Sequence, residues 1–175
     1  ITLDQIGIFS VAATLAFVLN IVIQALYKSF EPIIFREFTK IDFQDTNIKL
    51  YRFYLFAIFS TAFCISIFSK EFFQIATSGV FIEGYKIVPY LIISVVVSGI
   101  NTYFGIIIIA NKKTVLFSSV FMITAIINVM LNFLFIPLYG YYGAIFASIV
   151  SFLVAYIIFQ YNIMINNRYL FSQLF

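Results

Sequence analysis

Hydrophobic residues occur in long runs along this chain, and charged residues are confined to short segments between them. No charged side chain is found in residues 5–27, 53–69, 87–111 or 114–167. A helix needs about 20 apolar residues to cross a hydrocarbon layer of about 30 Å. Each of the first three windows is long enough for one such helix, and the fourth is long enough for two. The pattern therefore predicts five membrane-crossing helices.

The runs are continuous, whereas the strands of a membrane barrel alternate between apolar and polar residues. The predicted fold class is therefore all-α, a polytopic membrane helical bundle occupying residues 1–175 as one unit. We expect Pro32 to perturb or end the first helix, and Pro137 to Gly143 to form a tight turn. The predicted spans are residues 6–27, 51–69, 87–110, 114–136 and 144–162.

Charged residues gather in the connections between these spans. Residues 28–52 hold nine of them and are predicted to be a loop with a helical extension at 34–38, and residues 70–86 are predicted to lie at the membrane interface. Eight Lys and Arg residues fall on the side of the 28–52 loop, the 111–113 turn and the C-terminus, against two on the other side. The positive-inside rule then predicts that the C-terminus is cytoplasmic. Tyrosines near the span ends are predicted to be interfacial, namely Tyr27, Tyr51, Tyr54, Tyr85, Tyr90, Tyr139, Tyr141, Tyr142 and Tyr161.

Composition agrees with a membrane protein and argues against several chemistries. The chain is 63% hydrophobic and 10% charged, whereas about a quarter of a soluble domain is charged. It has no His, and Cys64 is its single cysteine, so neither a disulfide nor a metal cluster is predicted. No span has an ionisable residue near its middle, which argues against a proton relay and against an intramembrane enzyme. We predict no cofactor, and the lysines that give a net charge of +3 flank spans, so no nucleic-acid partner is predicted.

The first span carries a polar stripe. Asn20, Gln24 and Lys28 are spaced i, i+4, i+8, and Glu31 follows, so all four share one helical face. Amides facing lipid are costly, so this face should meet protein or water. Two interpretations remain open: a hydrophilic wall that contacts a polar substrate, or interhelical hydrogen bonds with an interfacial ion pair.

Further amides lie in later spans. Asn128 and Asn132 are again spaced i, i+4, which indicates a helix-packing ladder or, alternatively, the polar lining of a cavity; Asn101 presents the same choice. A stripe of small residues in the last span predicts close helix packing: Ala144, Ala147, Ser148, Ser151 and Ala155.

Several motifs together resemble the polysaccharide-exporter branch of the multidrug/oligosaccharidyl-lipid/polysaccharide flippase superfamily, above all its O-antigen and repeat-unit flippases. The matching segments are Lys112-Lys113, Asn128 to Asn132, Ile136-Pro137-Leu-Tyr-Gly140-Tyr-Tyr-Gly143-Ala144, Ser148 with Ser151, the entry segment Asp4 to Ala12, and Pro32.

The resemblance implies a two-lobe transporter of about 12–14 spans, of which this chain would be spans eight to twelve, an incomplete C-terminal lobe. Because the chain begins at Ile1, we expect a fragment that lacks the N-terminal lobe. The implied activity is flipping of a polyprenyl-diphosphate-linked oligosaccharide, an O-antigen or capsule repeat unit of lipopolysaccharide and polysaccharide biosynthesis, across the bacterial inner membrane by alternating access. The partners would be the lipid bilayer and this lipid-linked oligosaccharide, and a coupling cation could be another.

On this hypothesis, amides face the sugar and cations form a basic lip at the cytoplasmic mouth. The sugar-facing residues would be Asn20, Gln24, Asn101, Asn128 and Asn132, and the cations Lys28, Arg52, Lys112 and Lys113. Three alternatives remain. A polysaccharide repeat-unit polymerase would need a long periplasmic loop with basic residues, and a drug/cation antiporter of the same superfamily would need acidic residues or an aromatic cage in its spans. The third alternative is a purely structural membrane module.

Overall fold

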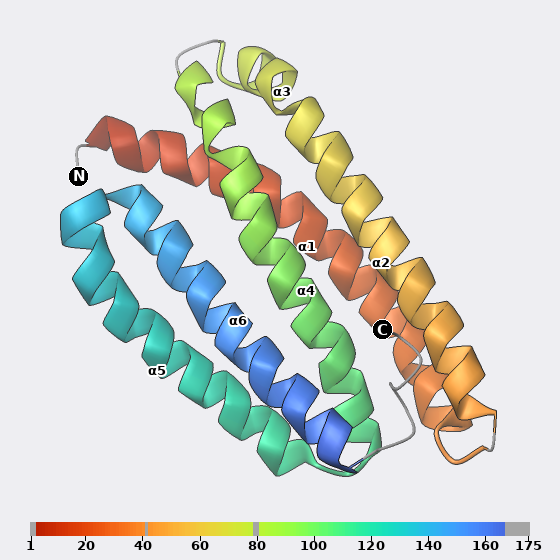
Figure 1. Cartoon of the computed structure of the whole chain (residues 1–175). Helices are drawn as coiled ribbons and strands as arrows, with labels where there is room; N and C mark the ends of the chain where they lie inside the picture. Colours follow the sequence, from red (N-terminus) through yellow and green to blue (C-terminus); the bar gives the residue numbers. More distant parts are fainter. Residues whose placement is uncertain (1–2, 41, 79–80, 167–175) are drawn as a thin grey trace.

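The computed structural model describes residues 3–40, 42–78 and 81–166, and every regular element in that part of the chain is helical. The elements are α1 (Leu3–Glu37), α2 (Phe43–Ile67), α3 (Ser69–Ala76), the 3₁₀ helix η1 (Ile82–Lys86), α4 (Val88–Ala110), α5 (Thr114–Tyr139) and α6 (Tyr141–Asn166) (Figure 1). Five of them, α1, α2, α4, α5 and α6, are long and apolar enough to cross a membrane. The predicted all-α bundle is confirmed.

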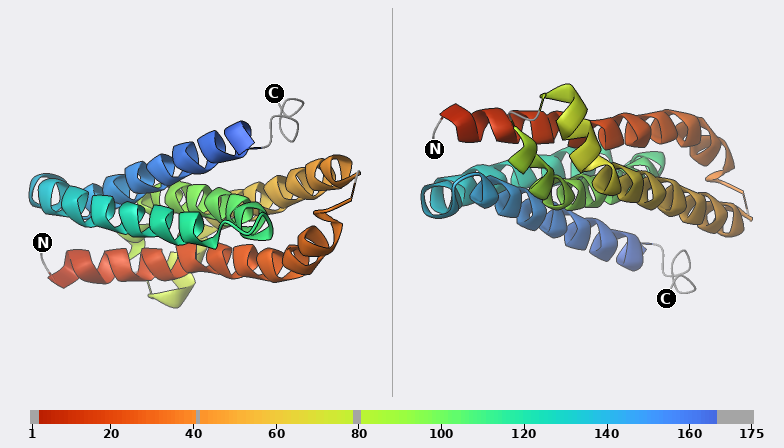
Figure 2. Two further views of the ribbon diagram at one scale, coloured as in Figure 1. Left: turned by 90° about the horizontal axis from the view of Figure 1, so that it is seen from below. Right: turned by 90° about the horizontal axis from the view of Figure 1, so that it is seen from above.

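Helix α4 is the centre of the bundle. It packs against α1, α2 and α6, while α5 packs mainly against α6. Figure 2 shows α4 between α1 and α6 when the molecule is seen from either end of the vertical axis. The core is correspondingly rich in α4 side chains, and Tyr103, Phe104 and Ile107 are almost completely buried.

The first helix is longer than its predicted span. We expected Pro32 to perturb or end it and residues 28–52 to form a loop with a helical extension at 34–38. Instead α1 continues without a break through Pro32 to Glu37, so the expected extension is part of α1, and α2 begins at Phe43. Proline removes one backbone hydrogen bond from the helix. Burial of Phe30 and Ile34 on α1, and of Phe43 on α2, stabilises these extra turns against that loss.

The turn between α5 and α6 is also shorter than predicted. Helix α5 continues through Pro137 to Tyr139, and only Gly140 separates it from α6. Gly140 has a φ of 60°, which favours glycine. Gly143 lies inside α6, where an added Cβ would stand 2.3 Å from the carbonyl oxygen of Phe135. Gly140 thus permits a backbone conformation that other residues rarely adopt, whereas Gly143 permits a close approach of α6 to α5.

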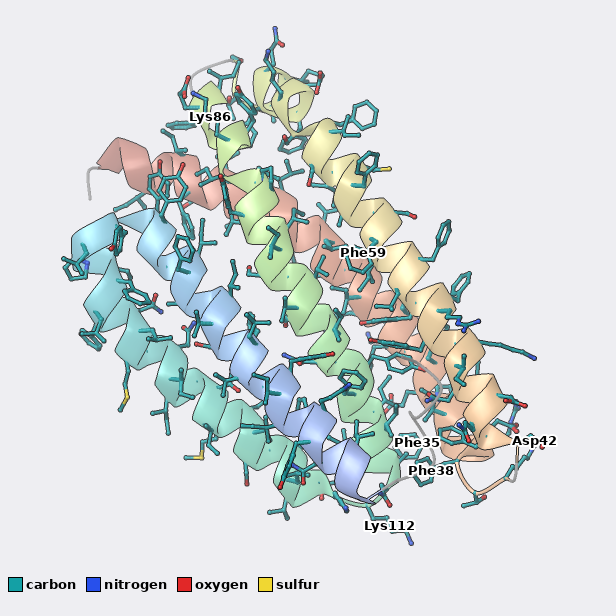
Figure 3. All side chains as sticks on the ribbon, in the orientation of Figure 1. Phe35, Phe38, Asp42, Phe59, Lys86 and Lys112 are labelled. Atoms are coloured by element: carbon teal, nitrogen blue, oxygen red, sulfur yellow. The ribbon has the colours of Figure 1, made fainter. Side chains whose placement is uncertain are left out.

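The two ends of the bundle differ in charge. Seven described Lys and Arg residues lie at the end where α1 meets α2 and α4 meets α5: Lys28, Arg36, Lys40, Lys49, Arg52, Lys112 and Lys113. Lys70 and Lys86 lie at the other end, and Figure 3 shows Lys86 opposite Asp42 and Lys112. Arg168 is outside the described residues. The described cations thus divide between the two ends of the bundle as the predicted topology requires. Which end faces the cytoplasm remains a prediction.

Candidate functional site

The predicted polar stripe lies on a part of α1 that the other described helices do not cover. Leu19 and Ile23 are buried on the packed side of α1, while Asn20 is half-buried and Gln24 and Lys28 are exposed. Within the described structure, neither amide side chain makes a hydrogen bond. This face is therefore polar, partly open and unsatisfied.

Glu31, the last residue of the same stripe, is hydrogen-bonded to a tyrosine. The Tyr27 hydroxyl donates to Glu31 Oε1 at 3.2 Å. None of the described ion pairs joins Lys28 to Glu31. Lys28 is exposed and takes part in none of the described ion pairs, so its ammonium group is available to an anion.

Asn128 connects α5 to α6, and Asn132 bonds to Asn128 within α5. Asn132 Nδ2 donates to Asn128 Oδ1 at 2.9 Å, and Asn128 Nδ2 donates to Ser148 Oγ at 3.4 Å. Asn132 Oδ1 is buried and has no hydrogen-bond partner. Asn128 and Asn132, joined to Ser148, thus form the helix-packing ladder that was one of our two interpretations.

Asn101 connects α4 to α6. It is 1% exposed, and its Nδ2 donates to the main-chain carbonyl of Phe152 at 2.8 Å, while its Oδ1 has no partner. The small residues predicted to permit close packing of the last span include Ser151 and Ala155, which are 0% and 1% exposed. The contact between α4 and α6 thus combines small side chains on α6 with a direct hydrogen bond from the Asn101 side chain of α4.

The five predicted amides therefore do not converge on one point. Asn20 and Gln24 lie on the uncovered face of α1. Asn101 and Asn128 bond to α6, and Asn132 bonds to Asn128 within α5. A groove between α2 and α4 is lined by none of the five amides.

The four predicted basic residues lie toward the same end of the bundle, but at different depths. Lys112 and Lys113 are in the turn between α4 and α5, whereas Lys28 and Arg52 are nine residues inside α1 and α2. Lys28, Arg52 and Lys112 are exposed and Lys113 is half-buried. None of the four takes part in a described ion pair. Lys112 has a φ of 58°, which turns the chain sharply between α4 and α5. This end of the bundle can attract an anionic group.

A buried polar cluster between α2 and α4 was missed from the sequence. The Tyr103 hydroxyl donates to Asn47 Oδ1 at 2.8 Å, and the Tyr54 hydroxyl donates to the Gly99 carbonyl at 2.6 Å. The prediction of Tyr54 as an interfacial aromatic was wrong, since it is 0% exposed and lies three turns inside α2. The i, i+7 spacing of Asn47 and Tyr54, together with a tyrosine in the middle of a span, could have indicated the cluster.

Comparison with protein-family models, curated proteins and solved structures finds no match. The function must therefore be argued from the chain itself. Its described surface combines the unbonded amides of Asn20 and Gln24 on α1 with Lys28, an exposed lysine on the same helix that takes part in none of the described ion pairs.

Proposed function

We propose that this chain is part of a membrane transporter, rather than an enzyme, that flips a polyprenyl-diphosphate-linked oligosaccharide across the bacterial inner membrane by alternating access. The observation that supports this proposal is the uncovered polar face of α1. Asn20 and Gln24 lie in an apolar span, make no side-chain hydrogen bond in the described structure, and precede the exposed Lys28 on the same face.

The depth of this face suits a sugar headgroup. Asn20 and Lys28 are eight residues apart, which is about 12 Å along a helix. Amides at this depth are costly if they face lipid. Water or a hydroxyl-rich ligand would satisfy them, and an oligosaccharide offers many hydroxyl donors and acceptors.

The charged end of the bundle suits the diphosphate. Lys28, Arg52, Lys112 and Lys113 are free of described ion pairs and lie in the half of the bundle toward the same end. Cations near an anionic headgroup attract it through Coulomb forces that weaken beyond about 8–10 Å in salt. If the positive-inside rule holds, this end faces the cytoplasm, where the lipid-linked substrate would be taken up.

The other amides have a supporting role in this proposal. Asn101 and Asn128 use their amide groups to bind α6, so we assign them to holding the helices together. Direct contact with sugar is assigned to α1. Asn132 retains a free Oδ1 but donates its amide to Asn128.

The experiment is a double substitution in the full-length protein, expressed in a bacterium whose surface polysaccharide depends on it. Asn20→Leu with Gln24→Leu should lower surface polysaccharide about thirtyfold, because two hydrogen-bonding groups worth about 1 kcal/mol each are lost. Lipid-linked oligosaccharide should accumulate in the cytoplasmic leaflet. The matched control is Phe17→Leu with Ile21→Leu, two exposed positions on the same helix.

Normal polysaccharide from a normally inserted double variant would contradict the proposal. A polymerase defect would differ again, since single repeat units would then reach the cell surface without being joined into chains.

A further inference from the structure

An apolar groove lies between α2 and α4, and no residue of α1 lines it. Its volume is about 770 Å³. The lining is almost entirely apolar, with Ser60 and Ser66 as its hydroxyl-bearing residues. Side chains of both helices form its walls, among them Phe59, Ala62, Ile92, Ile93, Val96 and Ile100.

The groove has a definite lower end. The Tyr54 hydroxyl binds the Gly99 carbonyl at 2.6 Å and holds α2 against α4 there. Ile100, the next residue along α4, is the last lining residue on that helix, and Pro89 is the first. These positions are eleven residues apart, which is about 16 Å along the helix axis. Half of a hydrocarbon layer of about 30 Å is about 15 Å, so the groove has the depth of one lipid leaflet.

The upper end of the groove lies next to two cations from α3 and η1. Lys86 is one helical turn before Pro89, and Lys70 is four residues after Ser66. The ammonium groups of both lysines lie 6.0 Å from the centre of the same Tyr85 ring. Two consecutive elements, α3 and η1, thus bring positive charge to the same tyrosine ring at this end of the bundle.

The two lysines are not equivalent. Lys86 forms an ion pair with Glu83, whose hydrogen bond raises the pKa of the ammonium group. Lys70 is exposed, and none of the described ion pairs includes it. An anion at this end would therefore bind Lys70 first. Helix α3 also exposes Ile75 to 83%, as a helix at the headgroup boundary should.

We propose that the groove between α2 and α4 holds an acyl chain of an anionic phospholipid whose phosphate binds Lys70 beside Tyr85. Three observations select this occupant: the groove is apolar, it has the depth of one leaflet, and it ends at an unpaired cation. The site lies on a different face from Asn20 and Gln24 and is independent of the transport proposal.

The test measures lipid retention by native mass spectrometry of the full-length protein in mild detergent. Phosphatidylglycerol and phosphatidylcholine with identical chains are titrated in parallel. Wild type should retain phosphatidylglycerol in preference to phosphatidylcholine. Lys70→Gln should lower this preference about fivefold, the effect of about 1 kcal/mol for one lysine near an anionic headgroup. Lys49→Gln, an exposed lysine at the opposite end, is the control and should leave the preference unchanged.

The groove itself is tested with bulky substitutions. Val97→Phe should lower retention of both lipids, since Val97 lines the groove, whereas Val115→Phe on the exposed side of α5 should not. Ser60→Leu, at an exposed lining position, provides a second groove variant if Val97→Phe fails to fold. Equal preference in the Lys70 and Lys49 variants would overturn the headgroup assignment. Wild-type retention in the folded groove variants would overturn the acyl-chain assignment, whatever their transport activity.

Discussion

The hydroxyl of Tyr54 donates a 2.6 Å hydrogen bond to the main-chain carbonyl of Gly99, and this bond joins α2 to α4 inside the bundle. Gly99 permits the contact with neighbouring helices, since an added Cβ would lie 2.7 Å from Ile23 Cδ1 of α1. Three helices therefore meet at one glycine. The same point closes the apolar groove between α2 and α4.

Removing this hydroxyl should weaken the bundle by a modest amount. Tyr54→Phe deletes one buried hydrogen bond while keeping the ring, and such bonds between membrane helices contribute about 0.6 kcal/mol on average and up to about 1.7 kcal/mol. We expect a loss within this range in the free energy of unfolding of the detergent-solubilised protein. Tyr161→Phe is the control, because the Tyr161 side chain is 65% exposed. Equal stabilities of the two variants would show that the bond does not stabilise the fold.

Gly143→Ala should destabilise the hairpin of α5 and α6 more strongly. The added methyl group would meet the backbone of Phe135, which cannot move aside as a side chain can. Overpacking of this kind costs about 1–3 kcal/mol. Gly7→Ala is the matched comparison, since its new Cβ would meet only the ring of Phe81 at 3.1 Å. Thermal unfolding in detergent should rank Gly143→Ala below Gly7→Ala, and the reverse order would contradict the close backbone approach.

Two substitutions at Asn101 should differ in their effect on stability, because one introduces a buried charge and the other an apolar side chain. Asn101→Asp places a carboxylate at a position that is 1% exposed and removes the donor to Phe152, so we expect a loss of more than about 2 kcal/mol. Asn101→Leu also removes the donor, but it removes the unpartnered Oδ1 as well. Its stability should therefore remain within about 1 kcal/mol of wild type. The check is the unfolding of both variants in detergent, and similar losses would mean that the amide oxygen has a partner.

The predicted orientation can be tested with a membrane-impermeant maleimide in intact cells. Cys64→Ser provides the background, and Lys112→Cys and Ser78→Cys place single thiols at opposite ends of the bundle. The positive-inside rule predicts that Ser78→Cys reacts from outside, while Lys112→Cys reacts only after permeabilisation. The opposite labelling pattern would invert the topology and remove the argument that the basic end meets a cytoplasmic substrate.

The sequence alone determined the helical class, the number of membrane-crossing helices and the location of the cations at span ends. Charge-free runs of about 20 residues permit few other structures, because backbone groups in lipid must bind one another. The i, i+4 pair Asn128 and Asn132 was likewise apparent as a polar element of one helix face.

Tertiary structure decided where the helices end and which polar groups meet. Continuation of α1 through Pro32 depends on burial of Ile34 against other helices, which local propensity does not reveal. The partner of Asn101 is a main-chain carbonyl 51 residues away, and that of Tyr54 is 45 residues away. Such contacts are set by how helices pack, so a periodic pattern could identify the polar groups but not the atoms that they bind.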